Sequence, residues 1–256
     1  MSELGWEQDG AVGTMTLNRP KQGNAFDAAL RAAVRERVAA IETDDAVRVV
    51  IVRGEGRNFC AGADLGGGGP EKPVNEHLDR EYKPFLQAMA EGSTIYIAEV
   101  QGSAAGIGGA FAMNCDLVTM ANTANVYMAF AAISLIPDGG NTWLLLQNMG
   151  YHRALEAVIE GRKIPAAECE RLGLANRVHP EGELRERTRE WAEELAGRAP
   201  LALGAAKRLL RRVGHMGYGD AISFEGLEQN RLIESRDFEE GVAAFFAKRA
   251  PAFEGR

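Results

Sequence analysis

The 256-residue sequence lacks several features that whole classes of protein require. No stretch approaches the ~20 apolar residues of a membrane-spanning helix. The N-terminal segment MSELGWEQDG has neither the basic nor the apolar region of a signal peptide. We therefore expect a cytoplasmic protein with no membrane partner. A net charge of −7 and the lack of a basic stripe argue against nucleic acid as a partner.

Patterns for metal binding and for two common kinds of site are also missing. The cysteines Cys60, Cys115 and Cys169 form no C-x-x-C pair, and the four histidines include no H-E-x-x-H pair. A disulfide framework and a metal site are thus not expected. The absence of G-x-x-x-x-G-K-[ST] excludes a P-loop, and the absence of G-x-S-x-G argues against a serine hydrolase.

The elements that the sequence does predict alternate along the chain. Asp27 can cap a helix whose apolar residues recur near helical spacing. Because parallel strands need helix-length connections, the alternation predicts an α/β core. Strands are predicted at residues 11–17, 47–54, 94–102, 116–121 and 126–130.

The C-terminal part differs from this core. After residue 199 the sequence shows helical periods and no strand signal. We therefore divide the chain into a core, residues 1–199, and a helical C-terminal region, residues 200–256. Phe245 and Phe246 predict an apolar face there, which packs either on its own core or on a neighbouring subunit.

Small residues gather in two turns that follow predicted strands. RNFCAGADL (57–65) and QGSAAGIGGAF (101–111) are both strand-to-helix junctions. Such turns can point backbone N–H groups into a cleft, whereas tight packing of strand on helix would also require small residues. Both interpretations stay open. The tetraglycine at 66–69 predicts a mobile loop.

A single carboxylate stands in the stretch SLIPDGGNTW (134–143). Asp138 can be a turn residue, a helix N-cap or an acid–base group. Burial against Leu135, Ile136 and Trp143 would raise its pKa, which is the useful direction for proton transfer near neutral pH.

Several segments together resemble the crotonase (enoyl-CoA hydratase/isomerase) superfamily, most closely its phenylacetate-pathway enoyl-CoA isomerases. They are NRPKQGNAF, FCAGADL, VQGSAAGIGGAFAMNCDL, ISLIPDGGNTWLL and DFEEGVAAFFAKRAPAFEGR. The resemblance implies an α/β spiral of repeated ββα units, followed by helices that assemble a trimer or a hexamer. It also implies an acyl-CoA thioester as substrate, with coenzyme A as part of that substrate and no separate cofactor.

The same resemblance assigns roles to individual residues. The backbone N–H groups of Ala63 and Ile107 would hold the thioester oxygen, and oxyanion donors of this kind contribute ~3–4 kcal/mol each. Ile107 is a departure, because the family usually has glycine there and a branched side chain narrows the pocket. Ala61 and Asp64 would bind the CoA portion. Lys248 would reach a nucleotide phosphate, often across a subunit interface, with Arg19 or Lys21 as further candidates.

Other departures bear on the reaction. Hydratases of the family use two glutamates, and those positions hold Ala110 and Phe130, which transfer no proton. Asp138 instead matches the acid–base aspartate of isomerase-like members. The dehalogenase branch is disfavoured, because its accompanying His and Trp match Ala131 and Phe130. Asn141, where glycine is usual, changes the turn that presents Asp138.

We therefore expect an enzyme that shifts a double bond in an enoyl-CoA by means of Asp138. An enoyl-CoA hydratase that uses Asp138 with a second group, and a non-catalytic acyl-CoA-binding protein, are the alternatives. Glu99, an acid within an apolar strand, is expected to be paired or to lie on a sheet face.

Overall fold

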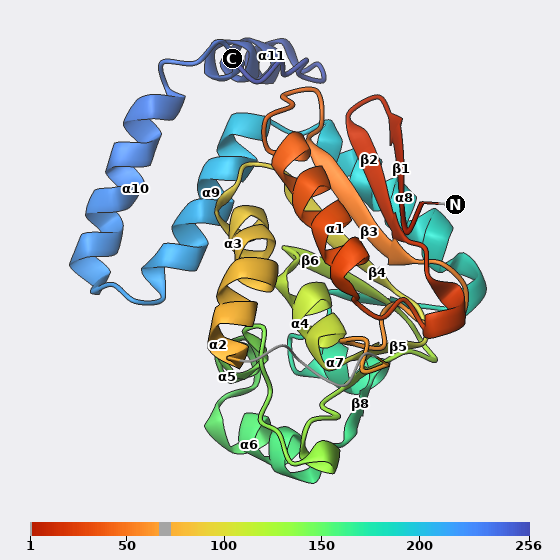
Figure 1. Ribbon diagram of the computed structural model, residues 1–256. Coiled ribbons are helices and arrows are strands. Elements are labelled where there is room, and N and C mark those ends of the chain that lie inside the picture. The colour runs from red at the N-terminus through yellow and green to blue at the C-terminus, as the bar shows by residue number, and fades with distance from the viewer. Residues whose placement is uncertain (1, 67–72) are drawn as a thin grey trace.

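The computed structural model describes residues 2–66 and 73–256 (Figure 1). The strands are β1 (Leu4–Asp9), β2 (Val12–Leu17), β3 (Val49–Gly54), β4 (Ile95–Val100), β5 (Ser103–Ala105), β6 (Leu117–Ala121), β7 (Asn125–Tyr127), β8 (Lys163–Pro165) and β9 (Arg177–His179). The α-helices are α1 (Ala28–Ile41), α2 (Val74–His77), α3 (Lys83–Glu91), α4 (Ile107–Asn114), α5 (Asn141–Met149), α6 (Tyr151–Glu160), α7 (Ala166–Arg171), α8 (Leu184–Ala196), α9 (Pro200–Val213), α10 (Tyr218–Leu232) and α11 (Arg236–Ala247). Short turns of 3₁₀ or π helix are η1 (Pro20–Gln22), η2 (Leu78–Tyr82), η3 (Ala131–Ile133) and η4 (Glu181–Glu183).

Two sheets organise the core. The larger has the strand order β1-β2-β3-β4-β6-β9, with β1 antiparallel to β2 and the remaining pairs parallel. The smaller has the order β5-β7-β8. The predicted α/β core is confirmed, and the five predicted strands correspond to β2, β3, β4, β6 and β7. The sequence did not reveal β1, because its residues LGWEQD are mostly polar and partly exposed at the sheet edge.

Helices cover both faces of the larger sheet (Figure 1). Helices α1, α3 and α4 pack on one face, and α8 packs on the other. The central strands β3 and β4 are buried along almost their whole length, because both faces are covered. The predicted cap of α1 is present, since Asp27 accepts a hydrogen bond from the Leu30 N–H at 2.8 Å.

The strands follow the repeating pattern of strand, strand and helix that the resemblance implied. In one unit β4 joins the larger sheet, β5 joins the smaller sheet and α4 follows. In the next unit β6 and β7 take the equivalent places, and α5 follows after the short turn η3. Each unit thus turns the chain sharply between the two sheets. The segments just after these turns bring distant parts of the chain together.

A buried acid in the larger sheet is paired, as expected. Glu99 on β4 is 2% exposed, and its carboxylate lies 3.7 Å from Arg53 Nε on the neighbouring strand β3. Burial raises the pKa of Glu99, and the charge of Arg53 opposes that shift. Glu99 is therefore a structural residue on the face that α8 covers.

The helical C-terminal region leaves the core after α9. Lys207 on α9 is buried, donates to the Thr94 carbonyl at 2.6 Å and forms an ion pair with Asp116 at 2.9 Å. These contacts fix α9 to the core, whereas α10 lies farther out and α11 returns over the end of the core (Figure 1). The segment after α11 is tied to the core, because Arg48 donates to the Phe253 carbonyl at 2.9 Å. The division at residue 200 stays a prediction. Residues 67–69 of the tetraglycine lie outside the described residues.

Candidate active site

The first candidate donor is the Ala63 N–H, which a single β-bridge orients. The Phe26 N–H donates to the Gly62 carbonyl at 2.8 Å, and the Asp64 N–H donates to the Phe26 carbonyl at 3.0 Å. Both bonds use the backbone of Phe26, so the peptide groups of Ala63 itself point the other way. Ala63 lines a cavity on that side.

The second candidate donor is the Ile107 N–H. Ile107 is the first residue of α4, so its N–H has no acceptor within the helix. Gly106, with φ at +53°, turns the chain from β5 into α4. A Cβ at Gly62 would lie 3.0 Å from the Ala105 carbonyl oxygen, so only glycine lets these two turns approach so closely. The two donors therefore come from adjacent turns.

Asp138 lines the same cavity as Ala63 and Ile107. The N-cap of α5 is Gly140, so the capping role considered for Asp138 is wrong. Its Oδ1 is buried and accepts no hydrogen bond from the described residues. Burial raises the pKa of Asp138, while a hydrogen bond from its own backbone and the nearby His77 oppose the rise. The carboxylate is therefore placed to take up a proton.

The direction of that pKa shift was predicted correctly, but the neighbours named for it were wrong. Leu135, Ile136 and Trp143 are 49%, 79% and 42% exposed and do not line this cavity. Asp138 is buried instead against Ile107 from α4 and the segment that carries Tyr82. The apolar run before Asp138 turns outward, because the turn η3 reverses the chain there.

The cavity has a volume of about 420 Å³. It brings together Ala63, Asp64, Ile107 and Asp138, four of the residues predicted from sequence. The described residues that line it are Asp27, Ala28, Arg31, Ala63, Asp64, Leu65, Gly66, Val74, His77, Leu78, Tyr82, Ile107 and Asp138.

The remaining predicted residues lie elsewhere in this chain. Ala61 is outside the cavity, and its N–H donates to the Gly23 carbonyl at 2.8 Å. Lys248 is the C-cap of α11 and does not reach the described part of the cavity wall. A contact of Lys248 with substrate held by a neighbouring subunit stays a prediction. Lys21 is exposed on η1.

Asp64 is held by two donors and is not available for proton transfer. It accepts from the Gly66 N–H at 3.0 Å and from Arg19 Nη2 at 3.1 Å. The Gly66 N–H, followed by Arg19, lowers the pKa of Asp64 below its usual value. Arg19 also forms an ion pair with Asp27 at 2.8 Å. The Arg19 guanidinium is therefore surrounded by carboxylates, which leaves it poorly placed to bind a phosphate.

Asn141 links the two sides of the site, a role that sequence reasoning missed. It is fully buried, and its Nδ2 donates to the Gly106 carbonyl at 3.0 Å and to the Asp138 carbonyl at 2.9 Å. One amide thus ties the turn that presents Ile107 to the turn that presents Asp138. A Cβ at Gly139 would lie 2.7 Å from Ile107 Cγ1, so the Ile107 side chain packs directly against the Asp138 turn.

Three more polar residues of the cavity were missed: His77 and Tyr82, which lie between residues 66 and 90, where no strand or helix was predicted, and Arg31 on α1. His77 from α2 contacts the Tyr82 ring edge-on at 5.7 Å between ring centroids. The Arg31 guanidinium lies 5.4 Å from the centroid of the same ring. Burial raises the pKa of Tyr82 to about 12, so its phenol stays neutral. Tyr82 ends a π-helical turn, a local geometry often found at functional sites.

Comparison with known proteins agrees with this arrangement. The family model described as "Enoyl-CoA hydratase/isomerase" matches residues 7–256. The chain belongs to the enoyl-CoA hydratase/isomerase family. It is therefore an enzyme of the crotonase superfamily, as the sequence motifs implied, and its fold is the crotonase α/β fold with C-terminal helices.

Individual members of the enoyl-CoA hydratase/isomerase family are similar over nearly the whole chain. The 1,2-epoxyphenylacetyl-CoA isomerase of Escherichia coli is 33% identical, with 96% of this chain and 95% of that protein aligned. A probable enoyl-CoA hydratase of Rhodobacter capsulatus is 36% identical, with 98% and 97% aligned. The crystal structure of an enoyl-CoA hydratase from Bacillus anthracis is 29% identical and has a TM-score of 0.94, covering 99% of this chain and 100% of that chain.

The positions of the family's two glutamates contain no titratable group in this member. Ala110 is buried on α4, and the Phe130 ring lies beside Gly106. Within the described residues, no group of three or more His, Cys, Asp or Glu side chains could hold a metal ion. No helix in that part of the chain is long and apolar enough to cross a membrane.

Proposed function

We propose that this enzyme shifts the double bond of an enoyl-CoA thioester, with Asp138 as its single acid–base group. The Ala63 and Ile107 N–H groups hold the thioester oxygen. The observation that supports this proposal most is that Asp138 lines the same cavity as Ala63 and Ile107. The positions that match the two glutamates of the family's hydratases hold Ala110 and Phe130, which transfer no proton.

The proposed steps need no water and no second acid. The Asp138 carboxylate takes a proton from the α carbon of a β,γ-enoyl thioester, and the electron pair of that C–H bond moves toward the carbonyl oxygen. The two N–H groups stabilise the resulting dienolate. Asp138 then returns the proton to the γ carbon, which leaves the double bond between the α and β carbons. A raised pKa suits both steps, since the group must accept and release the same proton.

Mass spectrometry in heavy water tests the proposal. We expect purified enzyme to convert a short β,γ-enoyl-CoA to its α,β isomer, with deuterium entering the acyl group and no gain of water. Asp138→Asn should lose both the isomerisation and the incorporation of deuterium. Asp45→Asn, at an exposed carboxylate between α1 and β3, is the matched control and should keep them. An Asp138→Asn variant with near-normal turnover would refute the role of Asp138.

A hydratase is the second candidate, and one observation favours it. His77 lines the same cavity and interacts electrostatically with Asp138, so a second titratable group is near the reaction site. Incorporation of labelled oxygen from water into the product would support hydration, because isomerisation incorporates none. In that case His77→Gln should also abolish incorporation. Tight thioester binding without turnover across a broad acyl panel would instead support the non-catalytic acyl-CoA-binding alternative.

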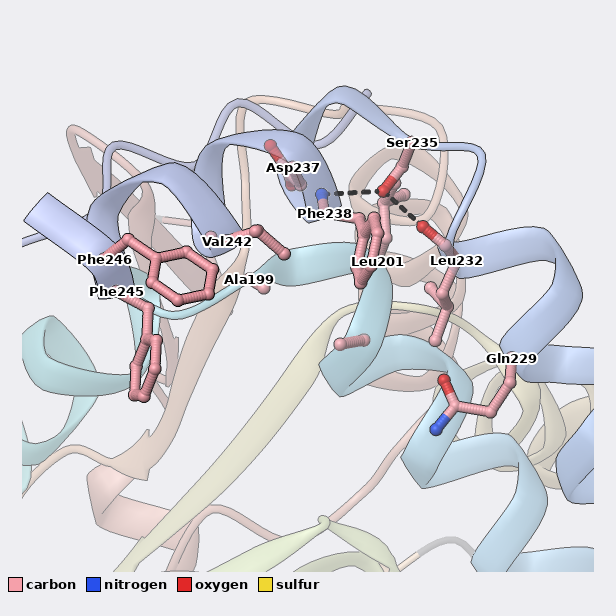
Figure 2. A pocket seen from close by; sticks show the side chains of 12 residues that line it. Ala199, Leu201, Gln229, Leu232, Ser235, Asp237, Phe238, Val242, Phe245 and Phe246 are labelled. Atoms are coloured by element: carbon pink, nitrogen blue, oxygen red, sulfur yellow. Dashed lines mark hydrogen bonds between the residues drawn. The ribbon is translucent and has the colours of Figure 1, made fainter.

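We also propose that the C-terminal helices form the interface of a homotrimer or of a hexamer. A groove at α9, α10 and α11 has a volume of about 400 Å³. The apolar side chains of Leu201, Leu232 and Val242 lie along it (Figure 2). Phe245 and Phe246 at its end are 77% and 79% exposed, a large apolar area for a single chain to leave in water. Analytical ultracentrifugation should find an oligomer that Phe245→Ser with Phe246→Ser dissociates. A monomeric wild type would contradict this.

A further inference from the structure

The candidate active-site cavity continues away from the oxyanion donors toward α9. A second cavity of about 700 Å³ shares Leu78 and Tyr82 with the first. A third cavity, of about 530 Å³, shares Gly139 and Trp143 with the second. Gly139 directly follows Asp138, so the three cavities lie one after another between the reaction site and the groove of α3, α5 and α9, and we take them as one route.

The far end of this route is basic. The third cavity is lined by Arg208, Arg211 and Arg212, all from α9, and its described acid is Glu91, which accepts from Gln87 Nε2 at 2.9 Å. The whole chain, by contrast, has a net charge of −7. A group of arginines in a protein with a net negative charge indicates an anionic ligand.

Two of these arginines have no carboxylate partner in the described chain. Arg211 is held in place, since its Nη2 donates to the Asn114 carbonyl at 2.8 Å and lies 3.2 Å from Asp116. Arg208 donates to Ser93 Oγ at 2.7 Å, and Arg212 lies over the Phe224 ring at 5.7 Å. Within residues 2–66 and 73–256, neither Arg208 nor Arg212 forms an ion pair.

Helix α4 gives a scale for the distance from the reaction site to Arg211, which neighbours Arg212 in sequence. It begins at Ile107, whose N–H is a proposed oxyanion donor, and ends at Asn114, whose carbonyl Arg211 binds. Its eight residues span about 10 Å along the axis, at roughly 1.5 Å per residue. An extended acyl chain, like an extended peptide backbone, advances about 1.2 Å per bond, so roughly eight or nine bonds cover the length of α4.

We propose that Arg208 and Arg212 form a subsite for a carboxylate at the far end of the acyl group. The substrate class is then the mono-CoA thioester of an unsaturated dicarboxylic acid with about eight carbons, the length that the α4 span allows. Trp143 contacts the methylene groups on the way. The guanidinium groups hold the terminal carboxylate by charge-assisted hydrogen bonds. This inference rests on the proposed function, because it takes the thioester carbonyl to lie at Ala63 and Ile107.

Calorimetric binding of saturated thioesters tests the subsite without requiring turnover. Suberyl-CoA and octanoyl-CoA have equal length and differ in the terminal carboxylate. We expect wild-type enzyme to bind suberyl-CoA about tenfold more tightly, as charged hydrogen bonds typically provide. Arg212→Met and Arg208→Met should each reduce that preference, and Arg212→Lys should keep part of it. Octanoyl-CoA should bind all variants equally.

The matched control is Arg187→Met, which removes one exposed arginine on α8, remote from the cavity. It should leave the preference for suberyl-CoA unchanged. Equal binding of the two thioesters by wild-type enzyme would overturn the proposal. An equal loss of affinity for suberyl-CoA, octanoyl-CoA and free CoA in Arg212→Met would also overturn the proposal, because the arginines would then bind the CoA phosphates instead.

Failure of the subsite and failure of the proposed function give different results. A preference for suberyl-CoA that Arg212→Met removes, in an enzyme that isomerises no enoyl-CoA, would support the subsite and refute the isomerase. Isomerisation that needs Asp138, with no preference between the two saturated thioesters, would support the isomerase and overturn the subsite.

Discussion

Of the three carboxylates that line the candidate active-site cavity, Asp64 and Asp138 lie in opposite environments. Asp64, after β3, is held by the Gly66 N–H and by Arg19, and its pKa is lowered. Asp138, before α5, is desolvated, and its pKa is raised. Environments that push two carboxylate pKa values apart are how one site keeps one group ionised and lets the other exchange protons.

The difference shows that position in the cavity does not by itself make an acid catalytic. Asp64 stabilises the wall because donors surround it, and Arg19 adds a second ion pair with Asp27. Asp138 has a buried oxygen that accepts no hydrogen bond from the described residues, which costs stability.

The largest expected effect is on turnover. Asp138→Asn should lower kcat by at least about 100-fold, the usual contribution of a general acid–base group. Asp64→Asn should lower kcat far less, because its carboxylate is ionised and already occupied by donors. Steady-state kinetics with a β,γ-enoyl-CoA measures both. Equal losses in the two variants would break the contrast.

The next effect is on the link between the two turns. Asn141→Ala should lower kcat about tenfold, because Asp138 and Ile107 would no longer be tied at a fixed separation. It should also lower the free energy of unfolding by about 1–3 kcal/mol, since two side-chain hydrogen bonds of a buried amide are lost. Asn148→Ala is the control, because Asn148 bonds only within α5, to the Leu144 carbonyl. An Asn141→Ala enzyme with normal kcat would show that packing alone holds the turns.

A smaller effect concerns the stability of the Asp64 side. Arg19→Met should lower the free energy of unfolding by about 1–3 kcal/mol, because Asp27 and Asp64 lose a shared cation that is largely buried. Arg35→Met is the control, since Arg35 is more exposed and lies 3.8 Å from Glu81. Urea denaturation compares the two. Equal losses of unfolding free energy in Arg19→Met and Arg35→Met would mean that the ion pairs of Arg19 stabilise the fold no more than a surface ion pair does.

The smallest effect is the dependence of stability on pH, which should have opposite signs for the two acids. The raised pKa of Asp138 means that its ionised form opposes folding, so Asp138→Asn should gain stability at neutral pH and lose that gain in acid. The lowered pKa of Asp64 stabilises the fold above the usual aspartate pKa, and this is lost as pH falls through the folded value. Thermal melts from acid to neutral pH measure both. If Asp138→Asn and Asp64→Asn changed the melting temperature with the same sign at neutral pH, the opposite pKa shifts of the two acids would be contradicted.

Local features of the sequence predicted much of the framework. The strands that became β2, β3, β4, β6 and β7 have residue patterns that are recognisable within a few positions. The helix cap at Asp27 is a local contact, because its carboxylate accepts from the N–H of Leu30, only three residues later. The oxyanion donors and Asp138 came from the resemblance to a family.

Contacts between distant residues could not be predicted in that way. Asn141 was noted only as a departure from glycine, yet its side chain bonds a carbonyl 35 positions away. The acid Asp138 was expected to be buried by its own neighbours in sequence, and it is buried by residues of other elements. Propensity describes a residue's own backbone, whereas these contacts depend on how separate elements pack.

The sequence by itself determined the alternation of strands and helices and the two turns of small residues, and its resemblance to a family singled out Asp138. The tertiary structure alone decided which acid is held by donors and which is desolvated, because desolvation depends on everything that packs around a group. It also placed Arg208 and Arg212 in a cavity that Gly139, the residue after Asp138, lines as well. Their separation along the chain is bridged only when α9 packs against α3.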